Sequence, residues 1–193
     1  MTNPGDKISR GRILVIAGCM FAGKTKRLIE ELRRAEAGGR RCAAFKHALD
    51  DRYAPSALAT HDGLQLPARP IATPEALLPE AERADVIGID EAHFFGRPLA
   101  GVIRQLRDRG RHVIAVGLDN DAWGRPFPPF PQLKEMADEI ILLRAPCTVC
   151  GEPAPYSQRM VPVTDEFMVG GLNEYEPRCA KCFVPLPPPA PDY

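Results

Sequence analysis

The chain has no excess of charge of either sign: Lys and Arg together number 25 of its 193 residues, and Asp and Glu also number 25. Proteins that bind nucleic acids usually carry a basic excess, so this balance argues against a nucleic-acid partner. No apolar stretch approaches the roughly 20 residues of a membrane-spanning helix. The polar N-terminal residues also lack the apolar segment of a secretion signal. We therefore expect a cytoplasmic protein with no membrane partner.

Internal repeats are absent as well, and disulfide bonds are not expected. The six cysteines are better explained as metal ligands and core residues, because thiols stay reduced in the cytoplasm. The length suits one domain with a small appendage.

What the chain does contain is an alternation of short apolar runs and helical stretches. This order predicts an α/β fold with a parallel sheet covered by helices on both faces. The apolar runs are Ile13–Ala17, Cys42–Phe45, Val86–Ile89, Val113–Val116 and Ile140–Leu143, and the helical stretches include Lys24–Ala37, roughly Leu99–Arg109 and Gln132–Ala137.

Shifts in composition divide the chain into four regions. Residues 1–11 are expected to form a flexible arm and residues 12–144 the α/β domain. Residues 145–183 hold four cysteines with several Gly and Pro, which indicates a small β-rich module. Residues 184–193 are rich in proline, which enters neither helices nor central strands, and are expected to form a flexible tail.

A glycine-rich loop is the most informative motif. Residues 18–25 fit G-x-x-x-x-G-K-[ST], the pattern of a phosphate-binding P-loop, and lie between a predicted strand and a predicted helix. Such a loop attracts phosphate through its backbone N–H groups and the helix N-terminus. Lys24 is expected to reach the β- and γ-phosphates, and Thr25 to bind Mg²⁺. The expected phosphate-binding residues of the loop are Gly18, Met20, Phe21, Ala22, Gly23, Lys24 and Thr25.

A second motif consists of two acids at the end of an apolar run. Asp90 and Glu91 follow Val86–Ile89 directly. Beside a P-loop, Asp90 is expected to hold Mg²⁺. Glu91 would lie next to the γ-phosphate, where a carboxylate can take a proton from a hydroxyl or from water. The alternative is that both acids cap the next helix.

Two cysteine pairs form a third motif. Cys147-x-x-Cys150 and Cys179-x-x-Cys182 supply four thiolates, the ligand set of a tetrahedral Zn²⁺ site. Four protein ligands leave no open position, so we expect a structural zinc that clamps both ends of residues 151–178. Unligated structural cysteines and disulfides are the alternatives.

In this order, these elements resemble the type II (cytosolic, zinc-containing) thymidine kinase family over about residues 12–183. The motifs that carry the resemblance are Gly18-x-Met20-Phe21-x-Gly23-Lys24-Thr25, Asp50-x-Arg52-Tyr53, Thr60-His61-Asp62, Gly88-Ile89-Asp90-Glu91-x-x-Phe94-Phe95, Leu118-Asp119, Cys147-x-x-Cys150 and Val169-Gly170-Gly171-x-x-x-Tyr175-x-x-x-Cys179-x-x-Cys182. The resemblance implies a RecA-like parallel sheet and a zinc-bearing "lasso" between the cysteine pairs, assembled as a homotetramer.

The resemblance also implies an activity, the transfer of the ATP γ-phosphate to the 5′-hydroxyl of a deoxynucleoside, with thymidine giving dTMP. In that reaction Glu91 is the implied general base, and Asp50 and Arg52 lie near the phosphates, as does Asp90. The implied nucleoside-binding residues are Met20, Phe94, Leu118, Met168, Val169, Gly170 and Tyr175.

Three positions near the nucleoside depart from the family pattern. Ala122 stands where the family usually has an aromatic residue, and Trp123 comes one position later. Met168 replaces a smaller β-branched residue, and His93 replaces an amide. We expect the four histidines to be structural or exposed, and His93 is singled out because it follows Glu91 by two positions.

Alternative functions follow from the same motifs. One is a kinase of this family with a different or broader nucleoside preference. A second is a zinc-ribbon P-loop ATPase in which Glu91 activates water. A third, a zinc-ribbon nucleic-acid module with an inactive P-loop, is disfavoured by the neutral charge and by the complete set of phosphate-site residues.

Overall fold

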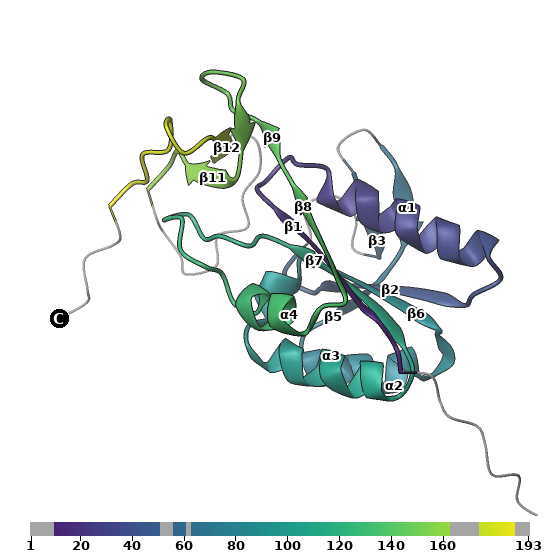
Figure 1. Ribbon diagram of the computed structural model, residues 1–193. Coiled ribbons are helices and arrows are strands. Elements are labelled where there is room, and N and C mark those ends of the chain that lie inside the picture. Colours follow the sequence, from purple (N-terminus) through teal and green to yellow (C-terminus); the bar gives the residue numbers. More distant parts are fainter. Residues whose placement is uncertain (1–9, 51–55, 61–62, 163–173, 188–193) are drawn as a thin grey trace, which may run out of the picture.

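A six-stranded parallel sheet forms the centre of the computed structural model (Figure 1), which describes residues 10–50, 56–60, 63–162 and 174–187. The strand order is β5-β2-β6-β7-β1-β8, and every neighbouring pair is parallel. The strands are β1 (Ile13–Gly18), β2 (Cys42–His47), β5 (Arg69–Ile71), β6 (Val86–Asp90), β7 (His112–Gly117) and β8 (Glu139–Leu143). The five apolar runs are thus confirmed as strands, and β5 is an edge strand that the sequence reasoning missed.

Helices cover both faces of this sheet, as the alternation predicts (Figure 1). On one face lies α1 (Lys24–Ala37), whose bounds match the expected helix. On the other lie α2 (Leu77–Glu80), α3 (Pro98–Asp108) and α4 (Phe130–Met136). Short 3-10 helices occur at η1 (Pro74–Ala76), η2 (Ala81–Arg83) and η3 (Ala92–Phe95).

Each face has its own apolar core because side chains alternate along a strand. In β1, Ile13 and Val15 join the core beneath α3 and α4, whereas Leu14 and Ile16 join the core beneath α1. A strand buried on both faces must be apolar throughout, which explains the continuous apolar runs of the sequence.

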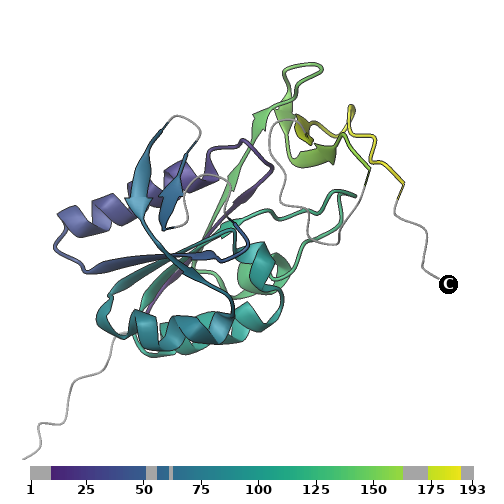
Figure 2. The ribbon, with the colours of Figure 1, turned by 180° about the vertical axis from the view of Figure 1, so that it is seen from behind.

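A hairpin of β3 (Ala57–Ala59) and β4 (Gln65–Pro67) lies beside α1 (Figure 2). Leu58 of this hairpin enters the core beneath α1. The hairpin strands are short and not strongly apolar, so the sequence gives little sign of them. None of the helices in the described part of the chain combines the length and apolar character needed to cross a bilayer.

A small β-rich module follows β8 directly (Figure 1). It pairs β9 (Ala145–Pro146) with β10 (Pro153–Ala154), and β11 (Tyr156–Arg159) with β12 (Tyr175–Arg178), both antiparallel. The β-rich character is as expected. The strands β10, β11 and β12 all fall within residues 151–178, between the two cysteine pairs.

We predict that Gly88→Val destabilises the fold by about 1–3 kcal/mol, because it overfills the core between β6 and α1. A Cβ atom at Gly88 would lie 2.9 Å from side-chain atoms of Leu28 and Leu32. Urea unfolding measures the change. The matched control is Gly101→Ala in α3, where a Cβ has open space and helix propensity predicts a gain of about 0.5–1 kcal/mol. Equal unfolding midpoints for G88V and the unchanged protein would contradict this packing account.

Candidate functional site

The P-loop connects the end of β1 at Gly18 to the start of α1 at Lys24. Phe21 and Gly23 have left-handed backbone conformations, with φ of 62° and 79°. Gly18 passes so close to β8 that a Cβ atom would lie 2.3 Å from the Leu143 carbonyl oxygen. Lys24 is buried and its Nζ donates a hydrogen bond to the Cys19 carbonyl oxygen at 2.7 Å. The ammonium group therefore lies across the loop, where phosphate charge is expected.

Thr25 and Asp90 meet where β1 and β6 end. Thr25 Oγ1 donates a hydrogen bond to Asp90 Oδ2 at 2.9 Å, and the Glu91 N–H donates to Asp90 Oδ1 at 3.0 Å. Burial, with the nearby charge of Glu91, raises the pKa of Asp90 well above its usual range. A divalent cation would compensate this buried negative charge. A hydroxyl and a carboxylate are oxygen donors of the kind that Mg²⁺ prefers, so these two residues fit the ion that the sequence predicts.

Asp50 and Lys46 place a pair of opposite charges at the same edge of the sheet. Asp50 is buried, and its charge contributes to the raised pKa of Asp90. Lys46 is 3% exposed, pairs in register with Asp90 between β2 and β6, and places its Nζ 4.0 Å from Asp50 Oδ2. The sequence reasoning missed Lys46. Its only signal was a lysine at the end of an apolar run, four residues before an acid.

Glu91 begins η3 in a left-handed conformation, with φ of 48°. This conformation is unfavourable for a residue with a side chain and is often found at functional sites. One carboxylate oxygen, Oε2, lies 3.5 Å from Nδ1 of His93. The chain thus turns sharply after Asp90, so that two consecutive acids take up different surroundings.

The predicted nucleoside residues fall into two groups. Phe94 and Leu118 both contact the His93 side chain: the two rings are 4.4 Å apart, and the Leu118 N–H lies 3.3 Å from His93 Nδ1. Met20 and Tyr175 are instead fixed to β11. The Met20 N–H donates to Ser157 Oγ at 2.8 Å, and the Tyr175 hydroxyl accepts a hydrogen bond from Arg159 Nη2 at 2.8 Å.

Ser157 and Arg159 are further residues that the sequence reasoning missed. Both are buried on β11. Nothing local in the sequence marks Ser157, since its partner Met20 is 137 positions away. Four other predicted site residues, Arg52, Met168, Val169 and Gly170, lie outside the described residues.

Trp123, the aromatic residue that comes one position later than the family pattern has it, makes local contacts. The Trp123 N–H donates to Asp121 Oδ1, and the guanidinium of Arg125 lies over the Trp123 ring at 4.8 Å. Phe127 instead approaches His93, with ring centroids 5.0 Å apart. An aromatic side chain is therefore present beside His93 although Ala122 is not aromatic.

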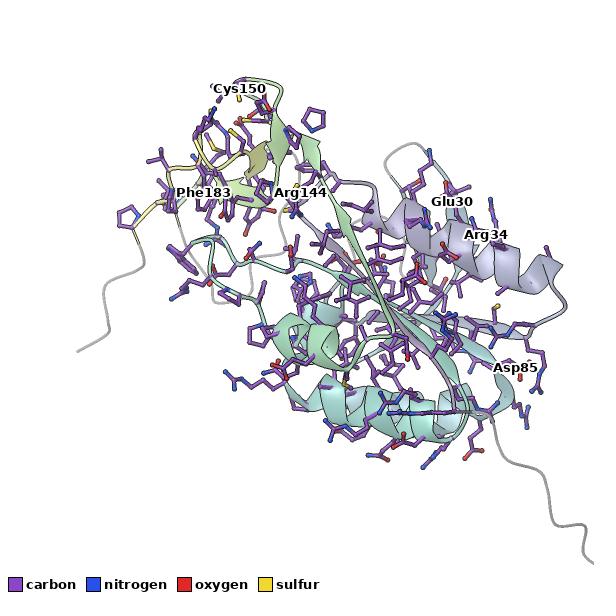
Figure 3. All side chains as sticks on the ribbon, viewed as in Figure 1. Glu30, Arg34, Asp85, Arg144, Cys150 and Phe183 are labelled. Carbon is purple, nitrogen blue, oxygen red and sulfur yellow. The ribbon has the colours of Figure 1, made fainter. Side chains whose placement is uncertain are left out.

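The four cysteines of the two pairs come together in the small module. Their sulfur atoms all lie within 4.8 Å of one another, and Cys150 lies at the outer end of the module (Figure 3). The Cys150 and Cys179 sulfurs are 3.6 Å apart, and those of Cys182 and Cys150 are 3.7 Å apart. Zn–S bonds of about 2.3 Å in a tetrahedron place sulfurs roughly 3.8 Å apart. The cluster therefore has the dimensions of a zinc site.

The thiols of this cluster also have the electrostatics of a cation site. Burial opposes ionisation of Cys147, but hydrogen bonds from the backbone of Cys179, Cys150 and Val149 lower its pKa to about 6. Hydrogen bonding with Cys150 and Cys179 raises the pKa of Cys182 to about 12. The four sulfurs thus compete for protons, and a metal ion that bound them as thiolates would replace those protons.

The P-loop packs against this module. Cys19 is buried in one apolar cluster with Cys147, Ala154 and Cys179. Its thiol donates a hydrogen bond to the Ala154 carbonyl oxygen at 3.0 Å. The Cys19 side chain thus joins the glycine-rich loop to the cysteine cluster.

Comparisons with known proteins all point to one family. A sequence model of thymidine kinases matches residues 11–183. The thymidine kinase of Rhodothermus sp. (strain ITI 518) is 43% identical over 180 residues, covering 93% of this chain and 84% of the relative. That of Bacteroides thetaiotaomicron is 42% identical over 175 residues, covering 91% and 88%. That of Porphyromonas gingivalis is 40% identical over 181 residues, covering 94% and 89%. The chain therefore belongs to the thymidine kinase family.

Proposed function

We propose that the chain transfers the γ-phosphate of ATP to the 5′-hydroxyl of thymidine, producing dTMP and ADP. The observation that carries the proposal is the arrangement of Lys24, Thr25, Asp90 and Glu91 at one edge of the sheet, in a chain that belongs to the thymidine kinase family. Phosphoryl transfer depends mainly on positioning and charge stabilisation, which this arrangement supplies.

Each of these residues has a distinct part in the proposed reaction. The P-loop N–H groups and Lys24 bind the phosphates. Thr25 and Asp90 hold Mg²⁺, which when bound with ATP neutralises charge on the phosphate oxygens. Glu91 accepts the proton of the 5′-hydroxyl, which makes that oxygen a better nucleophile. Asp50 and Arg52 act near the phosphates, as the family resemblance implies.

The nucleoside occupies the space between the two fixed groups of apolar residues. Phe94 and Leu118 form one side, and Met20 and Tyr175 the other, together with Met168, Val169 and Gly170. Residues 145–183 form a lasso domain beside the kinase domain of residues 12–144, and a structural zinc on the four cysteines holds it together. Closure of this lasso excludes water, so that ATP is not hydrolysed.

The family resemblance further supports a cytoplasmic homotetramer with ATP and a deoxynucleoside as its small-molecule partners. The balanced charge of the chain supports the absence of a nucleic-acid partner. A broader nucleoside preference is the second candidate, and Ala122 favours it because a small residue stands where the family has an aromatic one.

A nucleoside panel tests the proposed function. The purified protein is incubated with Mg-ATP and each of thymidine, deoxyuridine, deoxycytidine and the purine deoxynucleosides, and 5′-monophosphates are quantified by chromatography. We expect dTMP as the main product. ATP consumption that does not depend on any nucleoside would instead identify an ATPase.

Glu91→Gln tests the general base. We expect kcat to fall by about two orders of magnitude or more, the usual range for loss of a general base, because an amide cannot accept the proton. ATP binding, measured by calorimetry, should stay unchanged. Glu30→Gln, at an exposed position of α1, is the matched control and should keep full activity. A Glu91→Gln variant with normal kcat would remove Glu91 from this role.

Removal of the metal tests the link between the cysteine cluster and both substrates. We expect Cys150→Ser, or chelation, to lower the zinc content and to weaken thymidine binding first, because β12, which begins at Tyr175, leads directly into Cys179. ATP binding should weaken next, because Met20 and Cys19 are anchored on the module. Cys42→Ser, which alters a cysteine outside the cluster, is the control. Unchanged thymidine affinity in the metal-free protein would contradict the assignment of the lasso.

A further inference from the structure

His93 lies at a junction between three of the proposed site residues. Its side chain is 4% exposed. Nδ1 lies 3.5 Å from Glu91 Oε2 and 3.3 Å from the Leu118 N–H nitrogen, and the ring centroid lies 4.4 Å from that of Phe94. The buried imidazole thus contacts the proposed base and two proposed walls of the nucleoside pocket.

The surroundings of the imidazole fix its position. Phe127 packs against the ring, with centroids 5.0 Å apart. Gly117, the last residue of β7, leaves space for Nδ1, because a Cβ atom there would lie 2.8 Å from it and 3.0 Å from the Phe130 ring. A closely packed ring of this kind holds one orientation and passes that constraint to its neighbours.

We propose that His93 is a positioning residue that holds the Glu91 carboxylate in place relative to Leu118 and Phe94. This inference rests on the proposed function, in which Glu91 is the base. The burial of His93 argues that it acts through these neighbours rather than by contact with the nucleoside. Misplacement of a reacting group by about 1 Å can cost as much as 100-fold in rate, so such a constraint has a large effect on turnover.

The hydrogen-bonding capacity of His93 Nδ1 determines which of its neighbours it can hold. An imidazole nitrogen without a proton accepts a hydrogen bond, and a protonated one donates. Nδ1 faces a donor, the Leu118 N–H, and an acceptor, the Glu91 carboxylate, and it can serve only one of these partners through a hydrogen bond at a time. A glutamine side chain carries a separate oxygen acceptor and nitrogen donor. Glutamine can therefore serve both partners at once and should replace His93 in function.

Two substitutions test the proposal. His93→Gln keeps polar contacts to Glu91 and Leu118, whereas His93→Met fills the space without a hydrogen-bonding nitrogen, and methionine adapts well to irregular gaps. With ATP and thymidine as substrates, we expect kcat to fall between about 10-fold and 100-fold in H93M. H93Q should stay within about threefold of the unchanged protein, and the KM for ATP should stay constant in both.

A double-mutant cycle separates positioning from a general loss of structure. If His93 acts through Glu91, H93M should lower kcat little further in an E91Q background, because residues that act as a unit have non-additive effects. The proposal would be overturned if the two substitutions lowered kcat independently, so that their effects multiplied in the double variant. Equal losses of kcat in H93Q and H93M, or a normal kcat in H93M, would also overturn it. So would a rise in the KM for ATP that accompanies the loss of kcat. Absence of dTMP formation by the unchanged protein would overturn both this inference and the proposed function. If the unchanged protein forms dTMP but one of the contrary results for the His93 variants is found, only the role of His93 is overturned.

Discussion

Parallel pairing of β1, β6 and β7 brings their carboxyl ends to one edge of the sheet, and the candidate site depends on this alignment. The P-loop follows β1, Asp90 ends β6 and Leu118 follows β7. Hydrogen bonding between parallel strands sets the register, so a displaced strand would separate Thr25 from Asp90 and His93 from Leu118. The two apolar cores, one on each face, hold that register.

Burial of charged side chains at this edge costs free energy unless opposite charges lie nearby. Asp50 and Asp90 are both buried, and Lys24 and Lys46 are the buried ammonium groups near them. An isolated buried charge is strongly unfavourable, whereas a set of opposite charges can compensate one another. A triphosphate with its cation would add both signs at once. Lys24 would then face the phosphate charge, and Asp90 would face the cation.

Local patterns predicted much of this molecule, and long-range contacts account for most of what they missed. The continuous apolar runs and the periodicity of α1 identified five strands and a helix, because burial on two faces leaves a strong signal. The cysteine pairs predicted a metal site because CxxC spacing itself brings thiols together. By contrast, β5 is only three residues long. The contact of Ser157 with Met20 joins segments far apart in the sequence, so Ser157 carries no local signature.

The anchoring of the P-loop on the small module has a consequence for synthesis of the chain. Residues 18–25 leave the ribosome early, yet Ala154 and Ser157, which hold Cys19 and Met20, come far later. The flanking strands β7 and β8 are also late. A nascent chain therefore carries an unfinished candidate site during most of its translation. Such distant pairings slow folding, and the apolar β1 strand stays without its partners until β7 and β8 have emerged.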